Sequence, residues 1–189
     1  MCGRYSLAKE SVEVTVGTHR VGRQGKARYN IAPTQRAPVI RRNAQNLVID
    51  ELRWGLIPEW SRDEAIGFSL INARSETLAE RPMFKDLLPE NRCLIPADGF
   101  YEWKGRQPYY FQLPDKALFA FAGLWRDGRC VIITRTANAS MQGIHDRMPV
   151  ILPHGDWASW MHRFSLRDQA PELTARPVSL RVNSVCNDA

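Results

Sequence analysis

Hydrophobic and polar residues alternate along many short stretches of this chain, and a period of two is typical of strands with one buried face. Val12, Val14 and Val16 follow this alternation. Other runs are rich in β-branched and aromatic residues and are bounded by turn-forming residues, which also indicates strands. The strands predicted in this way span residues 3–7, 12–16, 37–42, 47–54, 92–95, 99–103, 109–113, 119–125, 129–134 and 176–182.

The residues between these strands indicate which strands pair. Residues 43–46 are expected to join two strands into a hairpin, and Asp127-Gly128 is expected to join another pair. An Asp-Gly pair suits the left-handed backbone of a tight hairpin turn. Pro33 keeps Ala32 out of the helical region, so RYNIAPTQ is predicted to be a shaped loop.

Helical patterns are fewer and shorter. Ser75 precedes a helix-favouring run that ends at Pro82, a second short helix is expected from Asn138 to Ile144, and surface helices are expected at residues 155–164 and 165–173. We therefore predict the α+β class, with a strongly bent, barrel-like, mostly antiparallel sheet and a few short flanking helices. The length of 189 residues fits a single domain, residues 1–189.

Composition narrows the class of protein. The longest apolar runs are of strand length, and the opening MCGRYSLAKE lacks the apolar core of a signal peptide, so neither a membrane segment nor secretion is expected. The cysteines Cys2, Cys93, Cys130 and Cys186 are widely separated. This spacing favours a reducing compartment and argues against a zinc cluster, so no metal or other cofactor is expected.

The basic residues suggest a polyanionic partner. The net charge is +6, and 21 arginines accompany only 5 lysines. The guanidinium fork of arginine suits phosphate groups better than the lysine ammonium does. No acidic residue occurs in the segment 14–49, which contains seven basic residues. Nucleic acid is the polyanion that we expect.

The first five residues, MCGRY, carry the most unusual chemistry. Removal of Met1 would make Cys2 the N-terminus, with a thiol and a free α-amine on adjacent carbons. The amine could condense with an aldehyde and the thiol could then close a thiazolidine ring, or the thiol could attack an acyl carbon with the amine as base. Both chemistries remain open on this stretch alone, as does an ordinary second residue.

Three further side chains are candidates for chemistry. Asn72 precedes the predicted helix start at Ser75, where anions are favoured, although it could simply be a turn residue. Glu102 shares one strand face with Phe100, so burial of that face would raise its pKa and suit it to proton transfer; an exposed edge glutamate is the alternative. His145 lies in a polar corner and could be an acid/base or a structural residue.

With these pieces in view, the chain resembles the SRAP family, the SOS-response-associated peptidase domain whose members crosslink to abasic sites in single-stranded DNA. Nine motifs carry the resemblance, in order and at family-like spacing: MCGRY, RYNIAPTQ, RWGLIPEW, INARSET, RCLIPADGFYEWK, GLW, TRTAN, IHDRMPVIL and RPVSLRVN.

The resemblance implies roles for individual residues. Cys2 would form the thiazolidine with the ring-opened sugar, Asn72 would hold that sugar, and Glu102 and His145 would transfer protons. Arg4, Arg74 and Arg147 match positions at the DNA backbone, and Pro33 and Trp54 match elements beside the nucleotides. The implied partner is single-stranded DNA with an abasic site, bound by a monomer without metal or membrane, in the bacterial cytoplasm and nucleoid or in the nucleus of a eukaryote.

Two departures and two rival functions accompany the resemblance. The segment between Leu7 and Tyr29 is short and rich in valine where the family usually has an amphipathic helix, and the chain ends at Ala189 where relatives usually continue. One rival is an N-terminal-nucleophile cysteine hydrolase, either an amidohydrolase or an autopeptidase that removes Met1. The other is a plain single-strand-binding module, for which Cys2 and Glu102 would be dispensable.

Overall fold

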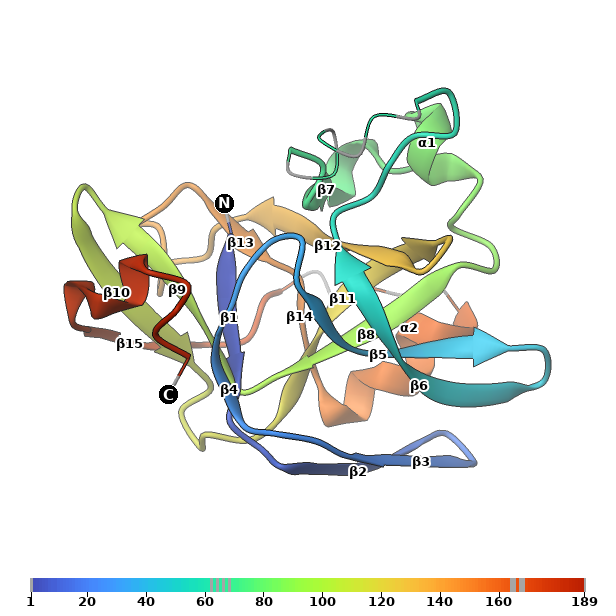
Figure 1. Cartoon of the computed structure of the whole chain (residues 1–189), viewed down its shortest axis with the longest axis horizontal. Coiled ribbons are helices and arrows are strands. Elements are labelled where there is room, and N and C mark those ends of the chain that lie inside the picture. Colours follow the sequence, from blue (N-terminus) through green and yellow to red (C-terminus); the bar gives the residue numbers. More distant parts are fainter. Residues whose placement is uncertain are drawn as a thin grey trace.

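The computed structural model describes residues 2–61, 63, 65, 67, 69–163, 166 and 169–188. Strands dominate this part of the chain and form two large sheets and a separate hairpin (Figure 1). The five-stranded sheet has the order β15 (Thr174–Pro177), β10 (Gln107–Gln112), β9 (Gly99–Lys104), β1 (Arg4–Leu7) and β4 (Arg28–Ile31). All its pairings are antiparallel.

The larger sheet closes into a ring because β12 pairs with both β6 and β11. Around the ring the order is β12 (Arg129–Thr136), β6 (Asn46–Trp54), β5 (Arg36–Asn43), β8 (Arg92–Ala97) and β11 (Phe119–Arg126). Three strands of three residues each extend it: β7 (Asn72–Arg74) and β13 (Arg147–Pro149) pair with β12, and β14 (Ile151–Pro153) pairs with β11. The α+β class and the barrel-like, mostly antiparallel sheet are therefore confirmed.

The predicted hairpins are present. β5 and β6 pair from Arg36–Arg53 to Asn43–Asn46, and β11 and β12 are joined by Asp127 and Gly128. Both turn residues have positive φ, 48° and 71°, as this tight hairpin requires. The valine-rich segment also forms a hairpin, β2 (Ser11–Val16) with β3 (His19–Gln24), at the periphery of Figure 1. The departure expected for this segment therefore takes the form of a strand pair.

The helices differ most from the sequence predictions. The run after Ser75 forms only a 3₁₀ turn, η2 (Ser75–Thr77), and the helix α1 (Pro82–Lys85) begins at Pro82, whose fixed φ suits a first helical turn. Residues 139–144 form hydrogen-bonded turns rather than the expected helix. The helix at 155–164 is confirmed in outline by η3 (His154–Asp156) and α2 (Trp157–Arg163), although α2 buries Trp157, Trp160 and Met161.

The C-terminal predictions were partly wrong. The strand expected at 176–182 lies earlier, as β15, and Leu180–Asn183 form the 3₁₀ turn η4. The strand stops because the chain turns at Ser179, whose hydroxyl accepts a hydrogen bond from the N–H of Arg181. The helix expected at 165–173 is also wrong over its described residues, because 166 and 169–173 form a bend and irregular backbone; residues 165, 167 and 168 lie outside the described part of the chain.

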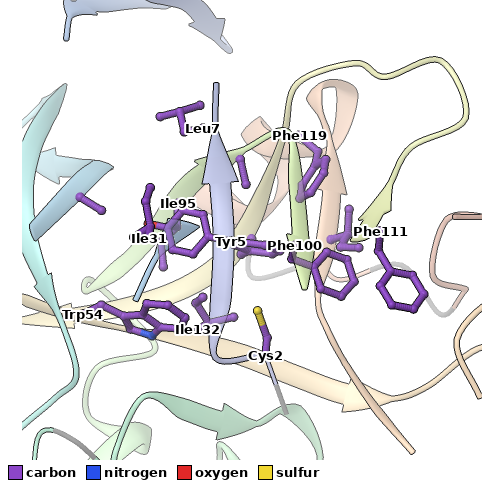
Figure 2. Close-up of a cluster of buried hydrophobic side chains, with 14 of the residues drawn as sticks. Cys2, Tyr5, Leu7, Ile31, Trp54, Ile95, Phe100, Phe111, Phe119 and Ile132 are labelled. Atoms are coloured by element: carbon purple, nitrogen blue, oxygen red, sulfur yellow. The ribbon is translucent and has the colours of Figure 1, made fainter. Parts of the chain in front are cut away.

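An aromatic core connects the two sheets at β1. Tyr5 contacts Trp54 and Phe121 edge-on, with ring centroids 5.3 and 5.5 Å apart, and Phe100 stacks on Phe111 at 5.1 Å. Figure 2 shows Tyr5, Trp54, Phe100 and Phe111 around β1, with the Cys2 sulfur pointing into the same cluster. The N-terminal strand is thus held in place by large buried rings, which fixes the position of Cys2.

Candidate functional site

Cys2 lies two residues before the start of β1 and is fully buried, with 0% of its surface exposed. Burial raises the pKa of its thiol well above the ordinary value, and the nearby charge of Glu102 acts in the same direction. Its sulfur lies 3.8 Å from the carbonyl oxygen of Arg4. The thiol is therefore neutral at physiological pH and needs a base before it can attack a carbon atom.

Asn72 holds the main chain of Cys2. Its Nδ2 donates to the carbonyl oxygen of Cys2 at 3.0 Å, across 70 positions in sequence. β7 places it there by pairing in parallel with β12, where Asn72 lies opposite Ile132. The other amide atom, Oδ1, is buried and has no hydrogen-bond partner within the described residues. Asn72 thus presents an acceptor to whatever occupies the site beside Cys2.

Glu102 is an acid inside an apolar face. It is 3% exposed, and its strand neighbours Tyr101 and Trp103 are half-exposed on the opposite face, as the alternation predicted. Burial raises the pKa of the Glu102 carboxyl, whereas the charge of His145 acts in the opposite direction. A carboxyl with a raised pKa can donate and recover a proton near neutrality.

His145 is the fourth of the residues predicted to take part in the chemistry, after Cys2, Asn72 and Glu102. Its Nδ1 accepts a hydrogen bond from the main-chain N–H of Arg147 at 3.0 Å and lies 2.8 Å from Oδ1 of Asp146. The first contact requires a bare Nδ1 and favours the proton on Nε2, whereas pairing with Asp146 requires a proton on Nδ1. The ring therefore has a partner in either protonation state, which suits a group that exchanges protons.

The three predicted arginines differ in their surroundings. Arg74 at the end of β7 is exposed. Arg147 is held by Glu76 in a bidentate pair, with contacts of 2.6 and 2.9 Å, and its Nε is buried without a hydrogen-bond partner in the described part of the chain. Arg4 lies beside the chain end, donating to the carbonyl oxygens of Val182 and Asn183 at 2.6 and 3.1 Å. A phosphate at Arg4 would have to displace these two contacts.

Pro33 and Trp54 lie next to each other, because the N–H of Thr34 donates to the carbonyl oxygen of Trp54 at 2.7 Å. Pro33 is half-buried in the loop between β4 and β5. Trp54, however, is 1% exposed, and its indole N–H donates to the carbonyl oxygen of Ile71. The expected contact between Trp54 and nucleotides therefore needs correction, since its ring belongs to the core. Trp60, from the same WGLIPEW motif, is 80% exposed.

The basic segment 14–49 is less available to a polyanion than its sequence suggested. Four of its arginines pair with acids from other parts of the chain: Arg20 with Glu13, Arg23 with Glu51, Arg28 with Asp188, and Arg41 with Asp50. The inference of a polyanion partner consequently depends on the arginines near Cys2 rather than on this segment.

Sequence reasoning missed Glu76 and the C-terminal segment. Glu76 belongs to the INARSET motif, so its sequence signal was present, but only the fold reveals Arg147 as its partner. Among the described residues, no group of three or more His, Cys, Asp or Glu side chains could hold a metal ion. Within the same part of the chain, no helix is long and apolar enough to cross a membrane.

Fold and site together define a class of protein: a strand-rich protein with a cysteine just before its first strand, near an amide, a buried carboxyl and an imidazole. The chain belongs to the SRAP family, because the family model described as "SOS response associated peptidase (SRAP)" matches residues 1–185.

Named relatives and solved structures agree with this membership. The chain is 38% identical to the abasic site processing protein YoaM of Bacillus subtilis, over 100% of this chain and 96% of that protein. It is 41% identical to the abasic site processing protein YoqW of the same organism, over 86% and 80%. A crystal structure of a protein from Bordetella bronchiseptica matches with a TM-score of 0.74 and 26% identity, covering 94% of this chain and 100% of that one.

Proposed function

We propose that this protein processes abasic sites in DNA, which is the activity that the names of its relatives state for them. The observation that carries the proposal is the meeting of Cys2, Asn72, Glu102 and His145 from four separate parts of the chain. An abasic site exposes an aldehyde in its ring-opened form. Amine, thiol, acid and imidazole are the groups that aldehyde capture requires.

The proposed reaction begins after Met1 has been removed. The Cys2 amine adds to the C1' aldehyde, Glu102 in its protonated form donates to the departing hydroxyl, and water leaves as the imine forms. The Glu102 carboxylate then accepts the thiol proton, and sulfur bonds to the carbon of this imine, which is protonated on nitrogen. The C=N electron pair moves to the nitrogen, which keeps its proton as the ring N–H. The sum is amine, thiol and aldehyde giving a thiazolidine and one water, with Glu102 returned to its starting state.

The position of the groups supports this sequence of steps. The amine and the thiol of one residue reach the same carbon, which replaces a bimolecular step by an intramolecular one. Burial keeps the Cys2 thiol neutral until a base is available, and Glu102 becomes that base once it has protonated the leaving hydroxyl. Asn72, with its unpartnered buried Oδ1, is proposed to accept a sugar hydroxyl.

We further propose that the DNA is single-stranded, because an unpaired strand can present a baseless sugar to a small site. Arg74 and Arg147 would hold phosphates, and the exposed ring of Trp60 would stack on a base. The protein would act as a monomer, in the cytoplasm if its source is bacterial.

The family description mentions a peptidase, and we limit that activity in our proposal to removal of Met1. A general cysteine peptidase uses a thiolate, whereas burial raises the pKa of the Cys2 thiol and disfavours the thiolate. No strand-cleaving step is needed for the proposed reaction.

The proposal is tested with a single-stranded oligonucleotide that carries one abasic site and with an undamaged strand of the same sequence. The protein without Met1 should give an adduct that survives denaturation with the first strand and none with the second. Cys2→Ala should remove this adduct. A wild-type protein that binds both strands without forming an adduct would instead select the plain binding module.

A further inference from the structure

The carboxylate of Glu76 connects the two short strands that carry site residues. Its oxygens accept from Nη1 and Nη2 of Arg147, and Oε1 also receives the main-chain N–H and the hydroxyl of Thr136 at 3.2 and 3.4 Å. Arg147 in turn donates to the hydroxyl of Thr134 at 3.2 Å. The result is a network, Glu76–Arg147–Thr134–Thr136, that joins the end of β7 to β12 and β13.

The strands that this network joins, β7 and β13, are both short. β7 and β13 have three residues each, and both lie against β12, β7 in parallel and β13 antiparallel. β7 begins with Asn72, and His145 precedes β13 by two positions. Bidentate pairing of guanidinium with carboxylate is strong and directional, so it fixes both distance and orientation. Glu76 therefore links the segments that carry Asn72 and His145 through a contact of defined geometry.

A hydrogen bond links this network to the imidazole of His145. The main-chain N–H of Arg147 donates to Nδ1 of His145, so any shift of Arg147 moves the group that selects the imidazole tautomer. The Arg147 side chain is 14% exposed, whereas that of Glu76 is 46% exposed. Glu76 therefore acts on His145 through Arg147. Its own hydrogen bonds are made with Arg147 and Thr136.

We propose that Glu76 is a positioning residue for the adduct-forming reaction, acting by bracing Asn72 and His145 through its paired contacts with Arg147. This role rests on the proposed function. A competing reading gives Glu76 a purely electrostatic role, in which its negative charge weakens phosphate binding at Arg147. For Glu76→Gln, the positioning role predicts a slower reaction at saturating DNA, whereas the electrostatic role predicts tighter DNA binding and an unchanged saturated rate.

The Glu76 carboxylate keeps its charge throughout the pH range of the assay, pH 6 to 9. Its hydrogen bonds to Arg147 lower the pKa of the Glu76 carboxyl to about 2. Because the folded pKa lies below the ordinary value of 4.5, the stabilising contact is complete above that value and is lost only as pH falls towards 2. Loss of the brace should therefore reduce the rate by the same factor across neutral pH, without moving the pH profile.

The test compares Glu76→Gln with Glu76→Asp and with the control Glu80→Gln, an exposed carboxylate from the same segment. For each processed protein, adduct formation is followed at saturating abasic strand from pH 6 to 9, and affinity for undamaged strand is measured separately. We expect Glu76→Gln to slow the saturated rate by about 10- to 100-fold at every pH, the range that a misplacement of about 1 Å produces. Glu76→Asp should recover part of the rate, and Glu80→Gln should match wild type.

A second readout does not depend on the reaction. Nitrogen chemical shifts of the His145 ring, assigned with His145→Asn, should change in Glu76→Gln and stay constant in Glu80→Gln. If the wild-type protein gives no adduct, the proposed function is wrong. The nitrogen chemical shifts of His145 still show in that case whether Glu76 positions the imidazole. Unchanged shifts, or a Glu76→Gln protein that binds undamaged strand more tightly and reacts at the wild-type saturated rate, would overturn the positioning role.

Discussion

Replacement of Glu102 by glutamine should raise the free energy of unfolding of the protein and slow adduct formation. The substitution keeps the size of a side chain that is 3% exposed and removes its ionisation. Burial raises the pKa of this carboxyl, so ionisation costs more in the folded protein than in the unfolded one. Each unit of difference is worth about 1.4 kcal/mol.

The sign of the pH effect follows from this difference. At pH 4, below the ordinary glutamate pKa of 4.5, the carboxyl is mostly protonated in both states and its ionisation cost is small. As pH rises above 4.5 the unfolded state ionises first, and folding stability falls until the folded carboxyl has also lost its proton. Glu102→Gln avoids this loss, so its advantage in free energy of unfolding over wild type should grow from pH 4 to pH 8.

The same substitution should slow the chemistry. Proton transfer by a positioned acid/base contributes about 10²- to 10⁴-fold to a rate. Urea unfolding at pH 4, 6 and 8 measures the first effect, and adduct formation with an abasic strand at pH 7 measures the second; Glu80→Gln is the control in both. A variant that is less stable than wild type at pH 8, or that reacts at the wild-type rate, would refute the role assigned to Glu102.

Three further substitutions test other parts of the account. Asn72→Ala removes the 3.0 Å bond to the Cys2 carbonyl oxygen and should slow the saturated adduct rate by about fivefold, since a hydrogen bond contributes about 1 kcal/mol; an unchanged rate would contradict its role. Trp60→Ala removes an 80% exposed ring and should weaken binding of undamaged single strand by about 1 kcal/mol or more in a fluorescence titration, whereas equal affinity would exclude stacking. Gly99→Ala places a Cβ 2.1 Å from the Tyr110 ring, so it should lower the free energy of unfolding by about 1–3 kcal/mol in urea, and a stable variant would show that the ring can move away.

The strands of this protein could be predicted because their signals are local. Alternation in residues 12–16 and an Asp-Gly turn at 127–128 depend only on neighbouring residues, and both structures form as expected. The shared face of Glu102 and Phe100 followed from the alternation, but whether that face was buried or exposed stayed open until the fold showed Glu102 to be 3% exposed. Recognition of the family motifs supplied the remaining candidates.

Features that depend on distant parts of the chain could not be predicted in this way. The run after Ser75 favours a helix by composition, yet Glu76 pairs with Arg147, 71 positions away, and only a 3₁₀ turn forms. Trp54 was expected beside the nucleotides, and its burial arises from the ring-shaped sheet around it. The contacts between Arg4 and residues 182–183 likewise appear only when the chain end packs beside β1.

The central claim is that Cys2, as a free N-terminus, closes a thiazolidine on the abasic aldehyde. The most direct measurement is the intact mass of the protein before and after incubation with an abasic single strand, followed by treatment with borohydride. We predict a protein that lacks Met1 and an adduct whose mass is the sum of protein and DNA minus one water, unchanged by borohydride because no imine remains. Protein that lacks Met1 and forms no adduct, or an equally stable adduct formed by Cys2→Ala, would contradict the claim.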